Sequence, residues 1–283
     1  MGLSWDCDTK IGVGLIGCGS IGTVIAKAID DGRAGGLKLV AVYDIVREHA
    51  ERLVKVLSKS PVIAETSDLL IRRRDINLVV EAASQDAVRE YAVKVLEEGK
   101  DLMVMSTGAL LDEDLYQEVL NTARRLGRKV YIPSGAIVGL DNIKSAALEE
   151  IESVTLTTRK PPVSFEGAPL IRKRGIDLTS IKEPKVLYEG PAREAVKLFP
   201  RNVNVAASLS LAGVGADRTR VKIIADPDVK GITHEIRVKG VFGELVTRTV
   251  NRPFPDNPKT SYIAALSAIA TLKRVSGNIN VGT

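Results

Sequence analysis

The chain has 283 residues, of which 45% are hydrophobic and 27% charged, a balance typical of a folded globular protein with enough length for two domains. Its 40 Lys and Arg residues and 35 Asp and Glu residues give a formal net charge of +5, and the two signs alternate along the chain. With only 4% aromatic residues, this interleaving disfavours a nucleic-acid-binding protein, which needs a basic stripe or stacking surfaces.

The pattern of apolar residues bears on where the protein works. No apolar run approaches 18 residues, and the first ten residues carry charges where a signal peptide has its apolar segment. We therefore expect a cytoplasmic protein that does not span a membrane. Cysteine and histidine number two each, so we expect no structural disulfide and no metal site.

In the first half of the chain, apolar β-type runs alternate with segments of helical period, which predicts a parallel sheet flanked by helices. The expected strands cover 10–17, 37–44, 77–83, 101–107 and 129–135. The expected helices cover 20–32, 47–57, 85–99 and 112–127. The fold class is thus α/β, with a Rossmann-type doubly wound domain over 10–145.

The second half has a different pattern. Strands are expected at 154–162, 185–190, 219–227, 233–240 and 243–250, and short turns join the last three into an antiparallel meander. Helices are expected at 192–199 and 203–213. These elements predict an α+β domain over 146–256, built on a mostly antiparallel sheet, for substrate binding and oligomerisation. The segment 259–275 is expected to form a helix that is apolar on nearly every side. We therefore expect 257–283 to form a C-terminal helix packed between the domains.

A glycine-rich motif follows the first expected strand. Gly17-Cys18-Gly19-Ser20-Ile21-Gly22 has the spacing that permits a tight turn, close approach of a pyrophosphate and packing of the next helix. Asp44 closes the next strand, 22 positions after Gly22, where its carboxylate would accept hydrogen bonds from a ribose. NAD is favoured, although Arg47 leaves NADP open. An ordinary tight strand-to-helix connection is the alternative.

Small residues also end the later strands, where open α/β sheets bind ligands. They would let a nicotinamide ring lie close to the backbone, or they simply end strands well. The segments concerned are Ala82-Ala83-Ser84, Ser106-Thr107-Gly108-Ala109 and Ser134-Gly135-Ala136.

Hydride transfer from a carbon that bears an amine or hydroxyl requires a nearby proton acceptor. His234 in THEIRVKG lies on the strand face of Ile236 and Val238 by alternation, whereas His49 lies on a charged helix face and is expected to point to solvent. A hydrogen-bonded core histidine is as compatible with this pattern as a catalytic one.

Eight segments, in chain order, resemble the L-aspartate dehydrogenase family: GLIGCGSIG, VVEAASQDAVREYA, MSTGAL, IPSGAIVGLD, LTTRKPP, FPRNVNVAASLSLAG, HEIRVKGVFGE and NPKTSYIAALS. The resemblance implies NAD- or NADP-dependent oxidation of L-aspartate to iminoaspartate, reversibly to oxaloacetate and ammonia, in NAD biosynthesis. It places the catalytic histidine on His234 and cofactor contacts on Ala136 and Asn204. Val138 departs from the pattern, which has a second small residue there.

The two carboxylates of such a substrate need cationic or amide partners. Lys160, Asn202 and Lys259 are candidates, as is Arg159, and surface solvation is the alternative for each. A homodimer or homotetramer is expected.

Two other functions remain open at this point. One is another two-domain dehydrogenase or reductase, acting on homoserine, a sugar or a cyclic imine. The segment MSTGAL carries no lysine, which weakens the case for an oxidoreductase that acts on sugars. The other is a nucleotide-sensing protein without chemistry, which would have no need of a titratable group beside the nicotinamide.

Overall fold

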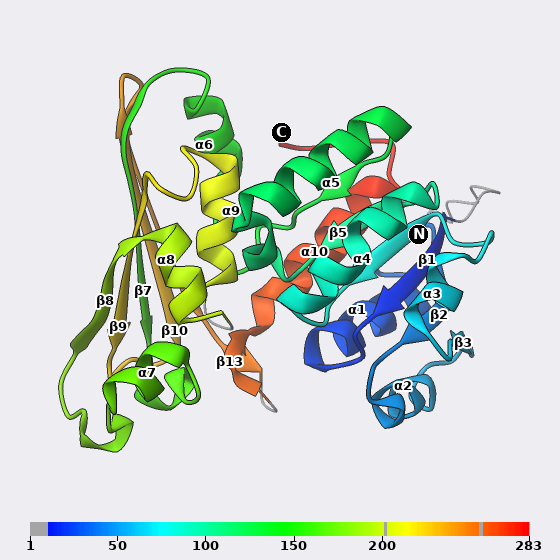
Figure 1. The fold of residues 1–283 in the computed structure, drawn as a ribbon, viewed down its shortest axis with the longest axis horizontal. Coiled ribbons are helices and arrows are strands. Elements are labelled where there is room, and N and C mark those ends of the chain that lie inside the picture. Colours follow the sequence, from blue (N-terminus) through cyan, green and yellow to red (C-terminus); the bar gives the residue numbers. More distant parts are fainter. Residues whose placement is uncertain (1–10, 201–202, 255–256, 283) are drawn as a thin grey trace, which may run out of the picture. The chain divides into compact units, whose positions relative to one another are not determined.

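The computed structural model describes residues 11–200, 203–254 and 257–282, apart from the side chains of 257–259. The chain divides into two compact units, one formed by Met1–Pro133 with Ala265–Val281 and the other by Ser134–Ala264 with Gly282–Thr283 (Figure 1). The segment 134–145, expected in the first domain, thus groups with the second unit, where Ile143 packs against Gly213.

The first unit contains a six-stranded parallel sheet in the order β3-β2-β1-β4-β5-β6. This confirms the expected doubly wound sheet. The order reverses between β1 and β4, and in open α/β sheets ligands bind beyond the carboxyl ends of the strands at such a reversal. The strands are β1 (Ile11–Ile16), β2 (Leu37–Tyr43), β3 (Val62–Ile63), β4 (Leu78–Glu81), β5 (Asp101–Val104) and β6 (Val130–Tyr131).

Helices connect these strands, and polar side chains fix where several of them begin. Thr66, Ser84 and Asp112 accept hydrogen bonds from the first-turn amides of α3, α4 and α5. Residues 105–107, expected to continue the strand that starts at 101, instead lead into a 3-10 turn, η1 (Thr107–Leu111). The helices are α1 (Ser20–Asp30), α2 (Arg47–Val54), α3 (Ser67–Ile71), α4 (Gln85–Glu97) and α5 (Glu113–Leu126).

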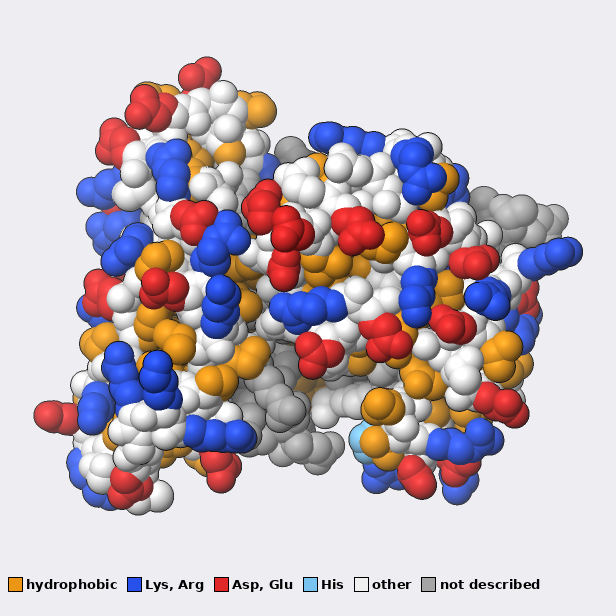
Figure 2. Space-filling view, in the orientation of Figure 1, with side chains coloured by type: hydrophobic (Ala, Val, Ile, Leu, Met, Phe, Trp, Pro, Cys, Tyr) orange, Lys and Arg blue, Asp and Glu red, His pale blue; other side chains and the backbone are white. Residues whose placement is uncertain are grey.

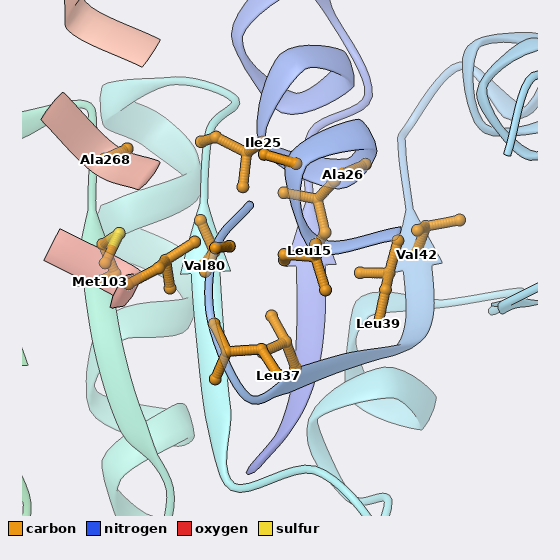
Figure 3. Close-up of a cluster of buried hydrophobic side chains, with 14 of the residues drawn as sticks. Leu15, Ile25, Ala26, Leu37, Leu39, Val42, Val80, Met103 and Ala268 are labelled. Atoms are coloured by element: carbon orange, nitrogen blue, oxygen red, sulfur yellow. The ribbon is translucent and has the colours of Figure 1, made fainter. Parts of the chain in front are cut away.

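A hydrophobic core packs α1 against the sheet of the first unit, and the last helix, α10 (Tyr262–Val275), contributes to it (Figure 3). α10 buries one stripe of side chains, whereas Ile263 and Leu266 on its other side are each 39% exposed. α10 thus has an exposed side, and its expected packing between the domains stays a prediction. The core side chains include Leu15, Ile25, Leu39, Val80, Met103, Ala268 and Leu272.

The second unit contains a five-stranded sheet in the order β11-β10-β7-β9-β8, in which only β7 and β9 pair in parallel. The mostly antiparallel sheet is confirmed. The expected meander of its last three strands is wrong, because β7 lies between β9 and β10, and only β10 and β11 form a hairpin. The strands are β7 (Ile151–Lys160), β8 (Lys185–Pro191), β9 (Thr219–Ala225), β10 (Ile232–Gly240) and β11 (Gly243–Asn251).

The remaining elements of the second unit are short. They are α6 (Leu140–Ala146), η2 (Pro162–Phe165), α7 (Pro169–Arg174), η3 (Leu178–Ser180), α8 (Ala192–Leu198), α9 (Asn204–Ala212), β12 (Pro253–Phe254) and β13 (Asn257–Ser261). Within the described residues, no helix is both long and apolar enough to cross a membrane. Figure 2 shows basic and acidic side chains interspersed over one face of the molecule, as their alternation in the sequence predicts.

The glycine motif offers a test of stability. A Cβ on Gly22 would overlap the carbonyl oxygen of Gly17, whereas a Cβ on Gly19 would meet no atom within 4 Å. Gly22→Ala should therefore lower the free energy of unfolding by about 1–3 kcal/mol, the usual cost of overpacking. Gly19→Ala is the matched control and should unfold at the wild-type urea concentration. Equal stabilities of the two variants would contradict this packing.

Candidate functional site

The glycine loop of the first unit joins β1 to α1. Gly17 has φ +98°, which only glycine adopts readily, and its amide donates to the carbonyl of Tyr43 at 2.8 Å. Gly22 is buried where α1 meets the loop, and the exposed Gly19 leaves open space above the helix N-terminus. Ser20 and Ile21 form the first turn of α1 and are half-buried. The loop thus has the form of an anion-binding turn.

Asp44 is tied to this loop rather than extended into solvent. Its carboxylate accepts hydrogen bonds from the amide of Cys18 at 2.7 Å and that of Val46 at 2.9 Å. His49, expected to point to solvent, has Nδ1 3.3 Å from a carboxylate oxygen of Asp44, and its side chain is 39% exposed. Burial and then the charge of Asp44 raise the pKa of the Cys18 thiol to about 12, so this cysteine remains protonated.

The predicted residues after β4 and β5 lie at the carboxyl ends of neighbouring strands. Ala82 and Ala83 follow β4, and the buried Ser106 and Thr107 follow β5. Glu81, which the sequence interpretation missed, is 2% exposed and accepts hydrogen bonds from both segments. Its position as the last residue of an apolar strand was the signal available in the sequence.

In the second unit, His234 lies in the middle of a row that crosses three strands. Its register partners are Thr158 on β7 and Thr249 on β11, and directly opposed residues of antiparallel strands share a face. His234 is 3% exposed, and its Nδ1 lies 3.0 Å from Oγ1 of Thr158. Burial, and then the charge of Lys160, lower the pKa of His234 to about 3. The imidazole is therefore neutral at physiological pH.

Lys160 lies on the same face of β7 as Thr158, two residues further along. It is 4% exposed, and burial lowers the pKa of its ammonium group to about 8. Arg159 projects to the opposite face, where its guanidinium pairs with Asp226 at 3.1 Å. Of these two cations, only Lys160 therefore shares a face with His234.

Polar side chains of β11 hold the turn that contains Ala136. The carbonyl oxygen of Ala136 accepts hydrogen bonds from Asn251 Nδ2 at 2.9 Å and Thr249 Oγ1 at 3.0 Å. Gly135 in this turn has φ +66° and faces Val205, the neighbour of Asn204 at the start of α9. The register of β11 thus brings Ala136 and His234 to one region of the second unit.

The predicted substrate residues are placed unequally. Lys160 is beside the histidine row, whereas Asn202 lies outside the described residues. Lys259 belongs to β13, but its side chain is also outside the description. The sequence interpretation missed Thr158, Thr249 and Asn251. Each of them meets its partner through the pairing of strands that are distant in the sequence. Residue spacing alone therefore gave no signal for them.

This arrangement has a definite chemical capacity. The first unit offers backbone amides and a carboxylate suited to a dinucleotide. The second offers a neutral imidazole, which can accept a proton, and a buried ammonium group, which can bind a carboxylate.

Two family models match the chain. Residues 141–275 match aspartate dehydrogenase, C-terminal. Residues 17–133 match homoserine dehydrogenase, NAD binding domain. The second match lies within the first unit, whereas the first covers most of the second unit and also the part of α10 that groups with the first unit.

Curated relatives extend over nearly the whole chain. The L-aspartate dehydrogenase of Methanosarcina barkeri is 49% identical over 272 residues, which is 96% of this chain and 99% of the relative. That of Methanococcoides burtonii is 51% identical with the same coverage. A crystal structure of aspartate dehydrogenase from Thermotoga maritima is 27% identical, with a TM-score of 0.73 over 97% of this chain and 100% of that chain. The chain belongs to the L-aspartate dehydrogenase family.

Proposed function

We propose that this protein oxidises L-aspartate to iminoaspartate with a nicotinamide dinucleotide as hydride acceptor, the reaction that supplies NAD biosynthesis. The observation that carries the proposal is the buried, neutral His234, hydrogen-bonded to Thr158 and sharing a strand face with Lys160. A nucleotide-sensing protein without chemistry has no use for this group.

The residues of the first unit fit a dinucleotide. The open space at Gly19 admits a pyrophosphate, and the N-terminus of α1 directs amide groups and a positive dipole end toward it. Asp44 is fixed beside the loop, where a carboxylate binds ribose hydroxyls. When bound, a nicotinamide dinucleotide would supply the hydride acceptor. Ala82, Ala83, Ser106, Thr107, Ala136 and Asn204 are the further contacts that we propose.

His234 acts as the proton acceptor in this proposal. The α-amine of aspartate must lose a proton before its carbon can release hydride, and a neutral imidazole takes that proton. Nε2 is free to do so when Nδ1 carries the hydrogen and donates it to Thr158 Oγ1. Lys160 in its charged form binds a substrate carboxylate, with Asn202 and Lys259 as additional partners.

We further propose that the chain prefers NAD to NADP and forms a homodimer or homotetramer. The charge of Asp44 opposes the 2′-phosphate of NADP. Sedimentation of the purified chain measures its oligomeric state, and a monomer would contradict the second proposal.

Replacement of the proposed base should abolish most turnover without affecting cofactor binding. We expect His234→Ala to lower kcat for aspartate oxidation by ~10²-fold or more, the scale for loss of an acid–base group. Its dissociation constant for NADH should stay near the wild-type value. Arg237→Gln, on the opposite face of the same strand, is the control and should keep wild-type kcat. Normal turnover by His234→Ala would make this histidine structural.

The role of Lys160 predicts a pH dependence of carboxylate binding. The pKa of its ammonium group is lowered to about 8, so its charge is present below that pH and lost above it. The inhibition constant of succinate, whose carboxyls remain ionised throughout, should rise above pH 8. In Lys160→Met it should be higher and flat from pH 7 to 9. Arg159→Met is the control and should retain the inflection, while persistence of the inflection in Lys160→Met would exclude this role.

Cofactor preference should depend on the charge of Asp44. Asp44→Asn should raise the kcat/KM ratio of NADP to NAD by about tenfold, because repulsion of the 2′-phosphate disappears. Asp30, at the other end of α1, also has a carboxylate that accepts hydrogen bonds from backbone amides. Asp30→Asn therefore serves as the control. An unchanged ratio in Asp44→Asn would show that another group sets the preference.

A further inference from the structure

Glu81 is a buried carboxylate at the point where the strand order of the first unit reverses. It ends β4 and is the register partner of Ile16, which immediately precedes the glycine loop on β1. Its side chain is 2% exposed. Burial raises the pKa of Glu81 above its ordinary value, and hydrogen bonds from its neighbours oppose this rise. A charge-bearing group in such a position needs donors to offset its desolvation.

Four donors converge on this carboxylate. Oε1 accepts from the amide of Ala83 and the hydroxyl of Ser106, both at 2.8 Å. Oε2 accepts from the amide of Ser106 at 2.9 Å and that of Met105 at 3.2 Å. Each oxygen therefore accepts two hydrogen bonds, and the side chain joins the segments that follow β4 and β5.

The segment after β4 in turn supports the glycine loop. A Cβ on Gly17 would lie only 2.5 Å from the carbonyl oxygen of Ala82 and 2.7 Å from the amide nitrogen of Ala83. The backbone of Gly17 is thus packed directly on the peptide whose amide Glu81 holds. A shift of this peptide would move the loop.

We infer that Glu81 is a positioning residue for dinucleotide binding, which holds the turns after β4 and β5 and, through the Ala82–Ala83 peptide, the glycine loop in their binding positions. The inference rests on the proposed cofactor. It assigns to Glu81 an effect on cofactor affinity beyond its effect on the stability of the sheet.

The substitution Glu81→Gln isolates this role, because it keeps size and shape but replaces one oxygen by an amino group. The hydroxyl of Ser106 can rotate and accept a hydrogen bond from this group, but the amide of Ala83 cannot. The amide of Ala83 then faces a donor, and its peptide loses its attachment next to Gly17.

Lys100→Met provides a matched control in the same unit. Lys100 is 5% exposed and precedes β5, at the opposite end of that strand from Ser106. Its ammonium group donates to the carbonyl oxygens of Arg73 at 2.7 Å and Ile76 at 2.9 Å. The control therefore also removes a buried charged group that makes two hydrogen bonds, but at the end of β5 away from the glycine loop.

The experiment measures the dissociation constant of NADH by calorimetry and the thermal midpoint of each full-length variant. Both Glu81→Gln and Lys100→Met should lower the midpoint, because each leaves buried polar groups unpaired. Only Glu81→Gln should weaken NADH binding, by about tenfold or more, the effect of a lost hydrogen bond to a charged group. Glu81→Asp, which keeps the charge but shortens the reach, should also weaken binding and replaces Glu81→Gln if that variant does not fold.

Three results would overturn the inference. In the first, the Glu81 variants bind NADH as the wild type does. In the second, Lys100→Met weakens binding as much as they do, which would indicate general destabilisation. In the third, the wild-type chain does not bind NADH, which would overturn the proposed cofactor as well. Tight wild-type binding with unaffected Glu81 variants would overturn this inference alone.

Discussion

The register between β10 and its two neighbours is the constraint on which the second unit's chemistry depends. It aligns Thr158, His234 and Thr249 in one row across three strands. One threonine orients the imidazole, and the other binds the carbonyl of Ala136. Because side chains alternate along a strand, a slip of one residue would turn His234 to the outer face, where Glu235 and Arg237 lie.

Both units place buried polar groups on their sheets and satisfy them with donors or acceptors from other segments. In the first, Glu81 accepts from the segments after β4 and β5. In the second, His234 and Lys160 share a face, and their burial keeps the imidazole neutral and lowers the pKa of the ammonium group to about 8. Removal from water is the dominant cause of both shifts. The same burial that costs stability thus keeps the imidazole neutral and limits the pH range over which Lys160 is charged.

The sequence predicted most of the parallel sheet because its longer strands and helices have a local signal in hydrophobic period. It missed β3 and α3, which are only two and five residues long. The glycine motif also predicted a turn in which Gly17 has positive φ and Gly22 packs tightly. Prediction was less successful where pairing joins distant segments. The insertion of β7 between β9 and β10 has no local signal, since it depends on which strand packs alongside.

The sequence by itself determined the fold class of both units, the glycine loop with Asp44 and the face of β10 on which His234 lies. Its resemblance to L-aspartate dehydrogenases also indicated the activity. Only the tertiary structure decided that Thr158 orients the histidine, that Lys160 rather than Arg159 accompanies it, and that Glu81 joins two strand ends. Alternation and motif spacing are properties of one segment, whereas these contacts depend on register between segments that lie up to 76 residues apart.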